Sequence, residues 1–373
     1  MGPTRAYINH QHLLHNYNLI KNAVAPAKVM CVVKADAYGH GSIEISRTLI
    51  DHGAQYLGVA FVEEGIELRK AGIQTPVLVF GAQLPEFMED HLRYNLDLTI
   101  TGEHQIDPLR QLCRKHNKKA RIYIKIDTGM NRVGFLMRDA RTIIDRLYDE
   151  SLFTIVGIYS HLSSSDEEDL TYTRQQLQRF DEIRSYISAR YSQPLLFHIA
   201  NSGAIMRLPE SYFDMVRPGV MLYGNPPGPD FDLHWDLKEV MTFASKVALI
   251  KRLGAGEPVS YSRRYYTNKE TDVAVIPVGY ADGYNRLLTN RGQVLIGGKR
   301  YPVVGSVCMD QILVDLGLDS GVEIGDEVVL FGEQGKVCIP NIEICRHLNT
   351  IPYEVTCWVS RRVPRIHVMS KTP

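Results

Sequence analysis

Apolar runs alternate with amphipathic segments along residues 1–230. The runs are rich in β-branched and aromatic residues and are bounded by Gly, Pro, Asn or Asp, which is typical of buried parallel strands. Eight of them are expected to form strands, at residues 29–35, 56–62, 76–81, 96–101, 121–127, 154–161, 195–200 and 215–223. Parallel strands need crossover connections, and the intervening segments are long enough to supply them as helices.

These intervening segments have the periodicity of amphipathic helices. One apolar stripe consists of Ala140, Ile143, Ile144 and Leu147, a second of Leu177, Phe180, Ile183 and Ile187, and a helix over 12–24 is expected to end before Pro26. Eight strands alternating with helices fit a closed (β/α)8 barrel of the TIM type, whose chemistry lies at the carboxyl ends of its strands. An open doubly wound sheet is the alternative, although no G-x-G-x-x-G motif follows the first strand.

The pattern changes after the glycine- and proline-rich stretch GNPPGP at residues 224–229. Short alternating segments follow between Gly, Asp and Asn turns, which predicts β structure with one helix near residues 342–348. We therefore expect an α/β protein. Residues 1–230 would form the N-terminal barrel, with the first few residues able to pack on the second domain, and residues 231–373 a C-terminal mostly-β domain.

Composition excludes several classes of partner. Lys plus Arg and Asp plus Glu both number 42, so no net charge attracts nucleic acid or an anionic membrane. No apolar run approaches the roughly 20 residues of a membrane helix, and the start MGPTR lacks the apolar core of a signal peptide. The six cysteines show no CxxC pair or His-Cys spacing. We expect a cytoplasmic protein with reduced thiols and no metal site.

The first expected strand ends on a lysine and opens into a glycine-bracketed turn, in the run VVKADAYGHG at residues 32–41. Desolvation at a strand end favours the neutral amine, which can attack a carbonyl carbon. Lys34 is therefore a candidate Schiff-base lysine. A snorkelling or salt-bridged lysine is the structural alternative.

Other polar residues stand at the carboxyl ends of later strands, where a closed barrel would bring them to one mouth. They are Lys125, His161, Asn201, Ser202 and Arg217. Asn201 and Ser202 begin an expected helix, whose free backbone amides attract phosphate, and the run RPGV at residues 217–220 is a second candidate phosphate site. Each residue alone has a plainer role, because buried polar groups at strand ends commonly bond only to backbone.

The run VVKADAYGHG closely resembles the pyridoxal phosphate attachment motif of alanine racemases. The resemblance spans residues 5–368 in family order, through YIKIDTGMNRVGF at 123–135, IANSGA at 199–204, VSYS at 259–262, GYADGY at 279–284, GSVCMD at 305–310 and IPYEV at 351–355. It implies that Lys34 carries pyridoxal 5'-phosphate. It also implies that the cofactor phosphate is held by Tyr38, Ser202, Gly219, Val220 and Tyr353.

The resemblance makes Arg217 the partner of the pyridine nitrogen. An arginine is donor-only and cannot supply a proton at working pH, so the ring nitrogen would stay unprotonated. The cofactor would then be a weaker electron sink, which restrains transamination and suits a racemase.

Racemisation needs acid/base groups on opposite faces of the substrate α-carbon. Lys34 is one of them, and by resemblance Tyr261 of the β domain is the other, paired with His161. Ser262 stands where the family commonly has a glycine. A tyrosine base must have its ordinary pKa near 10 lowered, or be held by hydrogen bonds, to act at neutral pH.

The resemblance also assigns the substrate site. It implies that Arg132 and the Met309 backbone amide bind the substrate carboxylate, that Tyr280 narrows the entrance, and that a homodimer forms with composite sites. In many relatives the lysine at position 125 is carbamylated and orients Arg132. An unmodified Lys125, salt-bridged to Asp127 or another carboxylate, is the alternative left open.

The expected function is therefore interconversion of L- and D-alanine, supplying D-alanine for bacterial cell-wall peptidoglycan. A decarboxylase of basic amino acids shares this architecture and cofactor, and Cys308 could be proposed as its cysteine, but such enzymes lack the VSY base. A cofactor-carrying homeostasis protein is the non-enzymatic alternative. Its family is a barrel alone, so the second domain counts against it.

Overall fold

The computed structural model describes residues 2–231 and 235–369, which form two compact units. Among the described residues, unit 1 contains 2–15, 38–40, 223–231 and 235–369. Unit 2 contains Asn16–Ala37 and Gly41–Leu222. Each unit is described by itself below.

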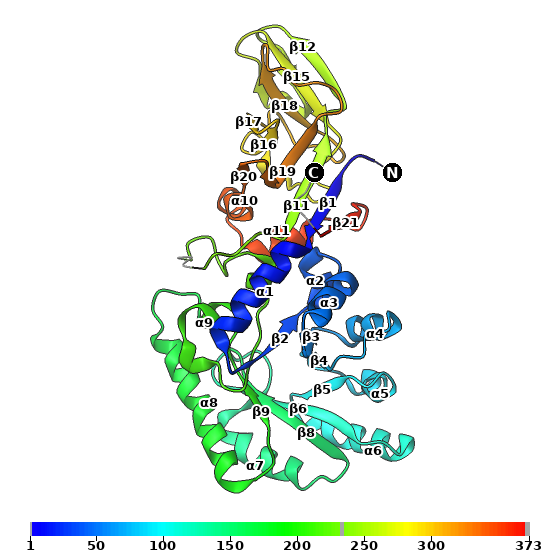
Figure 1. Ribbon diagram of the computed structural model, residues 1–373, viewed down its shortest axis with the longest axis vertical. Helices are drawn as coiled ribbons and strands as arrows, with labels where there is room; N and C mark the ends of the chain where they lie inside the picture. The colour runs from blue at the N-terminus through cyan, green and yellow to red at the C-terminus, as the bar shows by residue number, and fades with distance from the viewer. Residues whose placement is uncertain (1, 232–234, 370–373) are drawn as a thin grey trace. The chain divides into compact units, whose positions relative to one another are not determined.

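Unit 2 is an eight-stranded parallel barrel within its described residues, with the order β10-β2-β3-β4-β5-β6-β8-β9 (Figure 1). Its strands are β2 (Lys28–Val32), β3 (Tyr56–Val59), β4 (Val77–Val79), β5 (Asp97–Ile100), β6 (Ala120–Asp127), β8 (Phe153–Tyr159), β9 (Leu196–His198) and β10 (Met215–Val216). The short β7 (Phe135–Leu136) pairs with β6. All eight expected apolar runs therefore contain barrel strands.

Hydrogen bonds at both edges of β10 nearly close this sheet into a barrel. Met215 and Val216 pair with Lys28 and Val29 of β2. On the other side the Asp214 amide donates to the Phe197 carbonyl at 3.1 Å, and the Arg217 amide donates to the Ala200 carbonyl at 3.0 Å. This closure excludes the open doubly wound sheet. The eighth strand is shorter than expected, because the chain turns at Pro218 into a 3-10 helix, Val220–Tyr223.

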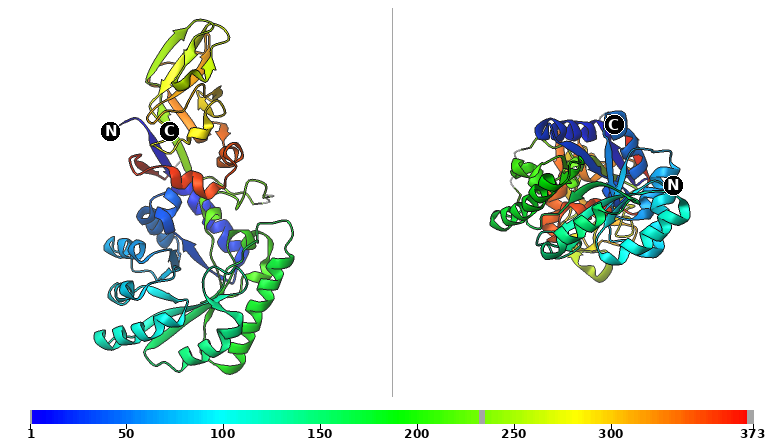
Figure 2. Two further views of the ribbon diagram at one scale, coloured as in Figure 1. Left: turned by 180° about the vertical axis from the view of Figure 1, so that it is seen from behind. Right: turned by 90° about the horizontal axis from the view of Figure 1, so that it is seen from below.

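Helices cover the outside of the barrel strands, as the view from below shows (Figure 2). After α1 (His10–Val24), which precedes the first barrel strand, these are α3 (Ser42–Asp51), α4 (Val62–Lys70), α5 (Met88–Arg93), α6 (Ile106–His116), α7 (Met137–Tyr148), α8 (Thr171–Arg190) and α9 (Ser202–Arg207). The two predicted apolar stripes lie on α7 and α8, where Ile144 and Phe180 are fully buried. Period-3.6 patterning thus placed both helices correctly.

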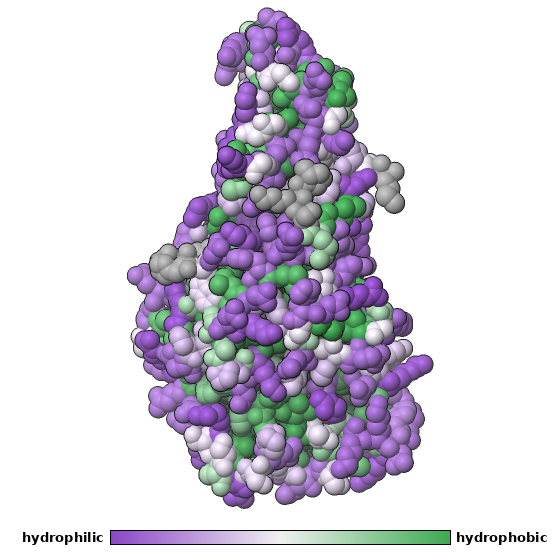
Figure 3. Space-filling model, in the orientation of Figure 1, coloured by the Kyte–Doolittle hydropathy of each residue, from purple (hydrophilic) through white to green (hydrophobic). Residues whose placement is uncertain are grey.

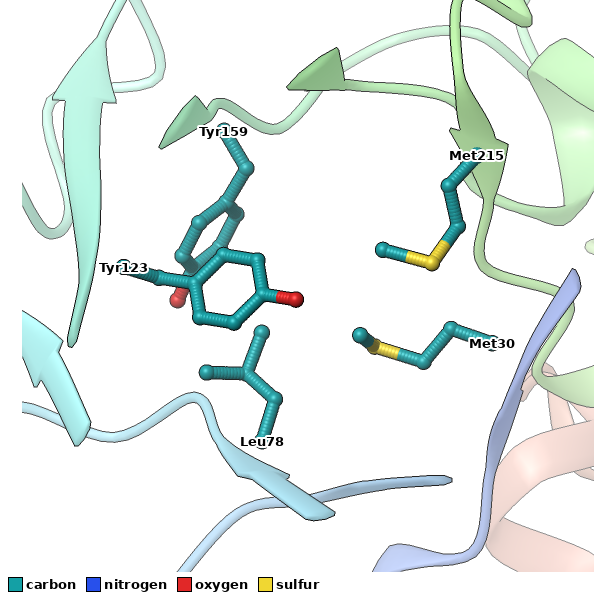
Figure 4. Packing of buried hydrophobic residues seen from close by; sticks show 5 residues of the cluster. All are labelled: Met30, Leu78, Tyr123, Tyr159 and Met215. Atoms are coloured by element: carbon teal, nitrogen blue, oxygen red, sulfur yellow. The ribbon is translucent and has the colours of Figure 1, made fainter. Parts of the chain in front are cut away.

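Side chains from five strands fill the barrel interior (Figure 4). They are Met30, Leu78, Tyr123, Tyr159 and Met215, each at most 3% exposed. The Tyr123 hydroxyl points toward the two methionines (Figure 4) and has no hydrogen-bond partner among the described residues. Burial accordingly raises the pKa of Tyr123 well above its ordinary value. The interior is a packed core that leaves chemistry to the strand ends.

Unit 1 is mostly β structure. Its larger sheet has the order β17-β16-β19-β11-β1-β21, from β17 (Lys299–Pro302), β16 (Gln293–Ile296), β19 (Glu327–Gln334), β11 (Met241–Lys246), β1 (Arg5–Asn9) and β21 (Arg365–Val368), with β20 (Val337–Ile339) paired to β19. A three-stranded sheet contains β12 (Leu249–Leu253), β15 (Thr271–Ile276) and β18 (Ile312–Gly317), and β13 (Pro258–Val259) pairs with β14 (Tyr265–Tyr266). The N-terminal strand β1 therefore belongs to this sheet.

In the described part of residues 231–373 the structure has two α-helices where one was expected. The expected helix is α10 (Asn341–Leu348), and α11 (Pro352–Trp358) follows it. The second helix was missed because it is short and starts at a proline, which is favourable only at the first helical position. On the face of the molecule in Figure 3, hydrophilic residues cover most of the surface, with small hydrophobic groups between them. None of the described helices has the length and apolarity of a membrane span.

Candidate active site

Lys34 comes two residues after the end of β2 and is the first residue of α2 (Lys34–Gly39), a short segment whose backbone turns left-handed. The strand ends at Val32, and residues 35 to 38 all have φ between 52° and 54°, although none of them is glycine. Left-handed backbone costs about 1–2 kcal/mol for each such residue, so surrounding contacts must hold this segment. Lys34 itself is half-buried at the carboxyl end of a barrel strand. The strand-end position expected for it is therefore the observed one.

Arg217, just after β10, is the centre of the barrel site. Its guanidinium is 5% exposed and donates to His198 Nδ1 at 2.7 Å and His161 Nδ1 at 3.2 Å. It also donates to the carbonyl oxygens of Ser160 at 2.8 Å and Ile199 at 3.1 Å. Burial lowers the pKa of Arg217 to about 10, so it remains cationic at neutral pH.

These bonds determine the tautomers of both histidines. Because a guanidinium can only donate, Nδ1 of His161 and of His198 must be unprotonated, and each neutral ring carries its proton on Nε2. Burial, followed by the charge of Arg217, lowers the pKa of both imidazoles well below the ordinary value. Both rings are therefore neutral at physiological pH, and their Nε2–H groups are donors.

Tyr159 of β8 lies beneath the charged groups. Lys125 Nζ is 4.9 Å from the centroid of its ring, and Arg217 Cζ is 5.3 Å from it. The His198 ring stacks on Tyr159 with 4.9 Å between centroids and 6° between planes. The Tyr159 hydroxyl shares a 2.9 Å hydrogen bond with Thr99 Oγ1, which fixes the ring.

Sequence reasoning missed both His198 and Tyr159. Tyr159 is the last residue of β8, and its Cα pairs with that of Lys125 in β6. His198 ends β9 just as Lys125 stands near the end of β6. The strand-end rule that selected Lys125 would also have selected His198.

Lys125 is 7% exposed and does not pair with Asp127. The Asp127 carboxylate instead accepts hydrogen bonds from the amides of Gly129 at 2.8 Å, Asn131 at 3.0 Å and Arg132 at 3.0 Å. No other carboxylate among the described residues forms an ion pair with Lys125. Burial, with the charges of Arg217 and Arg132, lowers the pKa of Lys125 well below its ordinary value. The salt-bridged alternative is thus absent from this structure.

Ser202 and Asn201 form a polar turn between β9 and α9. The Ser202 hydroxyl accepts from the Gly219 amide at 3.0 Å, which leaves its own hydrogen for a ligand. Asn201 Oδ1 caps the helix by accepting from the Ala204 amide at 3.1 Å and also accepts from Ser165 Oγ at 2.6 Å. Asn201 therefore shapes the turn, and Ser202 and the start of the 3-10 helix at Val220 offer the donors.

Two tyrosines expected at the cofactor phosphate belong to unit 1. The ring centroids of Tyr38 and Tyr353 are 5.9 Å apart, and those of Tyr38 and Tyr223 are 5.1 Å apart. Gly39 has φ of +83°, and a Cβ there would lie 2.4 Å from the Thr356 carbonyl oxygen. Only glycine allows this close approach, which brings the Tyr38 segment beside α11.

Tyr261 stands on a strained loop of unit 1 and is 73% exposed. Ser260 has φ of 64°, and Ser262 adopts φ 61° and ψ 11°. Ser262 thus occupies a left-handed position that suits the glycine common in the family, at a cost of about 1 kcal/mol. Reciprocal bonds hold the loop, because Ser260 Oγ donates to the Ser306 carbonyl at 2.7 Å and Ser306 Oγ donates to the Tyr261 carbonyl at 2.8 Å.

Met309 and Tyr280 lie on neighbouring loops of the same unit. The Tyr280 amide donates to the Cys308 carbonyl and the Ala281 amide to the Met309 carbonyl, each at 3.1 Å. Met309 is 53% exposed and Tyr280 is 43% exposed. Unit 1 therefore gathers three of the predicted site residues, Tyr261, Tyr280 and Met309, on adjacent loops with their large side chains in solvent.

The barrel donors suit pyridoxal phosphate. Lys125, Arg132 and Arg217 have no carboxylate partner among the described residues, so the site favours an anionic ligand. Within the described chain nothing accepts a hydrogen bond from Arg217 Nε, which leaves this donor for a ring nitrogen. Ser202 and nearby amides could hold a phosphate, and Lys34 an aldehyde carbon. Residues 2–231 and 235–369 contain no group of three His, Cys, Asp or Glu side chains placed to hold a metal ion.

Family models match nearly the whole chain. The model described as alanine racemase, N-terminal domain, matches residues 8–227, and that described as alanine racemase, C-terminal domain, matches residues 240–367. "Alanine racemase 2" of Caldanaerobacter subterraneus subsp. tengcongensis is 42% identical over 368 residues, covering 98% of this chain and 95% of that protein.

Solved structures agree with this match. Alanine racemase of Clostridium difficile 630 has a TM-score of 0.93 and 36% identity, covering 99% of this chain and 96% of the other. The alanine racemase of Bartonella henselae, solved with covalently bound pyridoxal phosphate, has a TM-score of 0.88 and 29% identity and covers 99% of this chain and all of the other. Full-length identity of this order, with the same two domains, leads to one conclusion: the chain belongs to the alanine racemase family.

Proposed function

We propose that the protein is a pyridoxal 5'-phosphate-dependent isomerase that interconverts L- and D-alanine, with Lys34 and Tyr261 as its two bases. The observation that supports it best is the Arg217 centre, where one permanent cation sets the proton positions of His161 and His198. The cofactor withdraws electrons from the substrate α-carbon when it is bound. The protein has to hold the cofactor, limit this withdrawal of electrons and move protons on both faces of the substrate α-carbon.

Residues of the barrel would hold the cofactor. Lys34 would bind it covalently, and Arg217 Nε would donate to its ring nitrogen. Ser202, Gly219 and Val220 would bind the phosphate together with Tyr38 and Tyr353. Arg217 cannot give up a proton at neutral pH, so its donation keeps the ring nitrogen unprotonated.

His161 would connect Arg217 to the second base. Its Nδ1 accepts from Arg217, so its Nε2–H can donate to the Tyr261 phenol oxygen. Such a donor stabilises the negative charge that a tyrosine base carries on its phenol oxygen. Lys34 would then exchange a proton with one face of the α-carbon and Tyr261 with the other, and Arg132 and the Met309 amide would orient the carboxylate.

Tyr261 would come from a second subunit in a homodimer. The exposure of Tyr261, Met309 and Tyr280 on adjacent loops supports this arrangement, because large apolar side chains gathered in solvent mark interaction surfaces. We place the activity in the cytoplasm, where it would supply D-alanine for bacterial peptidoglycan. Among the described residues, Cys308 Sγ contacts Ser260 Oγ at 3.4 Å and the Ser306 carbonyl oxygen at 3.5 Å, and neither contact favours decarboxylation.

We further propose that Lys125 is carbamylated. A buried amine of lowered pKa beside Arg217 and Arg132 is a nucleophile for CO2, and the carbamate anion would balance those cations. The amine nitrogen forms a bond to carbon and releases one proton. Protein kept in carbon-13 bicarbonate should show one carbamate NMR signal that is lost on acidification and missing from Lys125→Gln. A persistent signal in Lys125→Gln would place the modification elsewhere.

One assay tests the function. Purified protein with pyridoxal phosphate and L-alanine in heavy water should yield D-alanine with deuterium at the α-carbon, and D-alanine should yield the L form. Borohydride reduction and peptide mapping should place the pyridoxyl group on Lys34. Release of CO2, or cofactor binding without deuterium exchange, would instead identify a decarboxylase or a carrier.

A further inference from the structure

The left-handed turn after Lys34 is tied to a residue distant in the sequence. Glu64 lies in the first turn of α4, half-buried, and its Oε1 accepts from the Ala35 amide at 2.6 Å. Ala35 is the first of the four consecutive residues with φ near +53°. The hydrogen bond therefore acts at the first residue of the left-handed segment that follows β2.

The other oxygen of the same carboxylate binds the end of the neighbouring strand. Glu64 Oε2 accepts from the Ala60 amide at 2.7 Å and from the Phe61 amide at 3.1 Å, just after β3. One carboxylate thus joins the carboxyl ends of two adjacent barrel strands. Charge-assisted bonds of this kind are stronger than neutral ones.

Besides the packing of Tyr38 and Gly39 described above, two local hydrogen bonds support the turn. Asp36 Oδ1 accepts from the Ser42 amide at 2.7 Å, and the Asp36 carbonyl accepts from the Gly41 amide at 3.0 Å. These bonds close the turn on its far side. Among the described residues, the Glu64 bond is the one that connects the Ala35 amide to a different element.

We propose that Glu64 is a positioning residue for Lys34: it holds the left-handed turn and thereby sets the direction in which the lysine leaves the strand. This inference rests on the proposed role of Lys34 as the cofactor lysine. The backbone at residues 34 and 35 fixes where Cα–Cβ of Lys34 points, so relaxation of the turn re-aims the side chain. Reaction rates fall steeply when a reacting group is displaced by even about 1 Å.

Two substitutions separate this role from simple capping of α4. In Glu64→Gln the single amide oxygen can serve either Ala35 or the Ala60 and Phe61 pair, and the amide NH2 then faces the other donors. In Glu64→Asp the shorter side chain can still reach the local amides but cannot also span to Ala35. Glu63→Gln is the matched control, because Glu63 is the exposed neighbouring carboxylate in the same helical turn.

Two readouts are independent of turnover. Hydrogen exchange resolved to single amides should become about tenfold faster at Ala35 in Glu64→Asp, with Ala60 and Phe61 still protected. The rate at which the apoprotein attaches pyridoxal phosphate at Lys34, trapped with borohydride and mapped, should fall about tenfold in Glu64→Asp and Glu64→Gln. In the reconstituted enzyme kcat should fall with little change in KM for alanine, and Glu63→Gln should match the parent in every measurement.

The outcomes distinguish the two proposals. Parent-like labelling of Lys34 in soluble Glu64→Asp overturns the positioning role, as does faster exchange at Ala60 and Phe61 alone. If Glu64→Gln does not fold, Glu64→Asp still decides between these results. Failure of the parent to label at Lys34 would instead refute the proposed function, whatever the Glu64 variants do.

Discussion

Mixing Lys34→Ala with Tyr261→Phe subunits should restore racemase activity that neither variant has alone. Each variant by itself should lose at least about 10³-fold in kcat/KM, because each removes one of the two bases. If a site takes Lys34 from one chain and Tyr261 from the other, a mixed dimer contains one intact site and one doubly defective site. About half of the dimers should be mixed after statistical exchange, so roughly a quarter of parental activity should return.

The measurement is D-alanine formation after the two proteins are dissociated and reassociated, with mixed dimers quantified by a size or affinity tag on one chain. Each variant carried through the same treatment alone is the control. Absence of recovery despite abundant mixed dimers would mean that both residues act within one chain, or that Tyr261 is not the second base.

Arg217→Glu and Arg217→Gln should both racemise alanine about 10²–10³-fold more slowly, because each removes a preorganised cation. Only the glutamate variant should release pyruvate. Its carboxyl can share a proton with the ring nitrogen, and a protonated ring is a stronger electron acceptor, which favours transamination over return of the proton. Glutamine has the same size without an ionisable proton, so it is the matched control.

The same pair of variants tests the electrostatics of the site. Loss of the Arg217 charge removes one of the causes that lower the pKa of His161, so this pKa should rise in Arg217→Gln although burial still holds it down. The protonated fraction of His161 then grows as pH falls, and the acid limb of the pH–kcat/KM profile should move to higher pH.

Equal release of pyruvate by Arg217→Glu and Arg217→Gln would refute the role assigned to Arg217 as the partner of the ring nitrogen.

The barrel could be predicted from sequence because its determinants are local. A buried parallel strand needs a short run of β-branched residues, and an amphipathic helix needs one apolar stripe. Both patterns are readable in segments such as 121–127 and 137–148. The predicted boundaries were less accurate where contacts with other segments set the length of a short element. An example is β10, which ends at Val216, just before the chain turns at Pro218.

The candidate site could be predicted only in part. The strand-end rule and the family motif selected Lys34, Lys125, His161 and Arg217, and the structure joins the last two through a hydrogen bond. His198 was not selected, although it makes the shorter bond to Arg217. Its role depends on β9 and β10 being adjacent across the barrel closure, which no local pattern encodes.

The sequence by itself determined the alternation of strands and helices, the second β domain, and the residue types at the strand ends, since each follows from side-chain periodicity or a contiguous motif. Only the tertiary structure decided that Asp127 binds backbone amides rather than Lys125, and that the segment after Lys34 turns left-handed. Ala35, Ala37 and Tyr38 disfavour such a conformation, and only Asp36 is of a type that adopts it more readily. Contacts from other parts of the chain support it, among them the hydrogen bond from the Ala35 amide to Glu64 of α4.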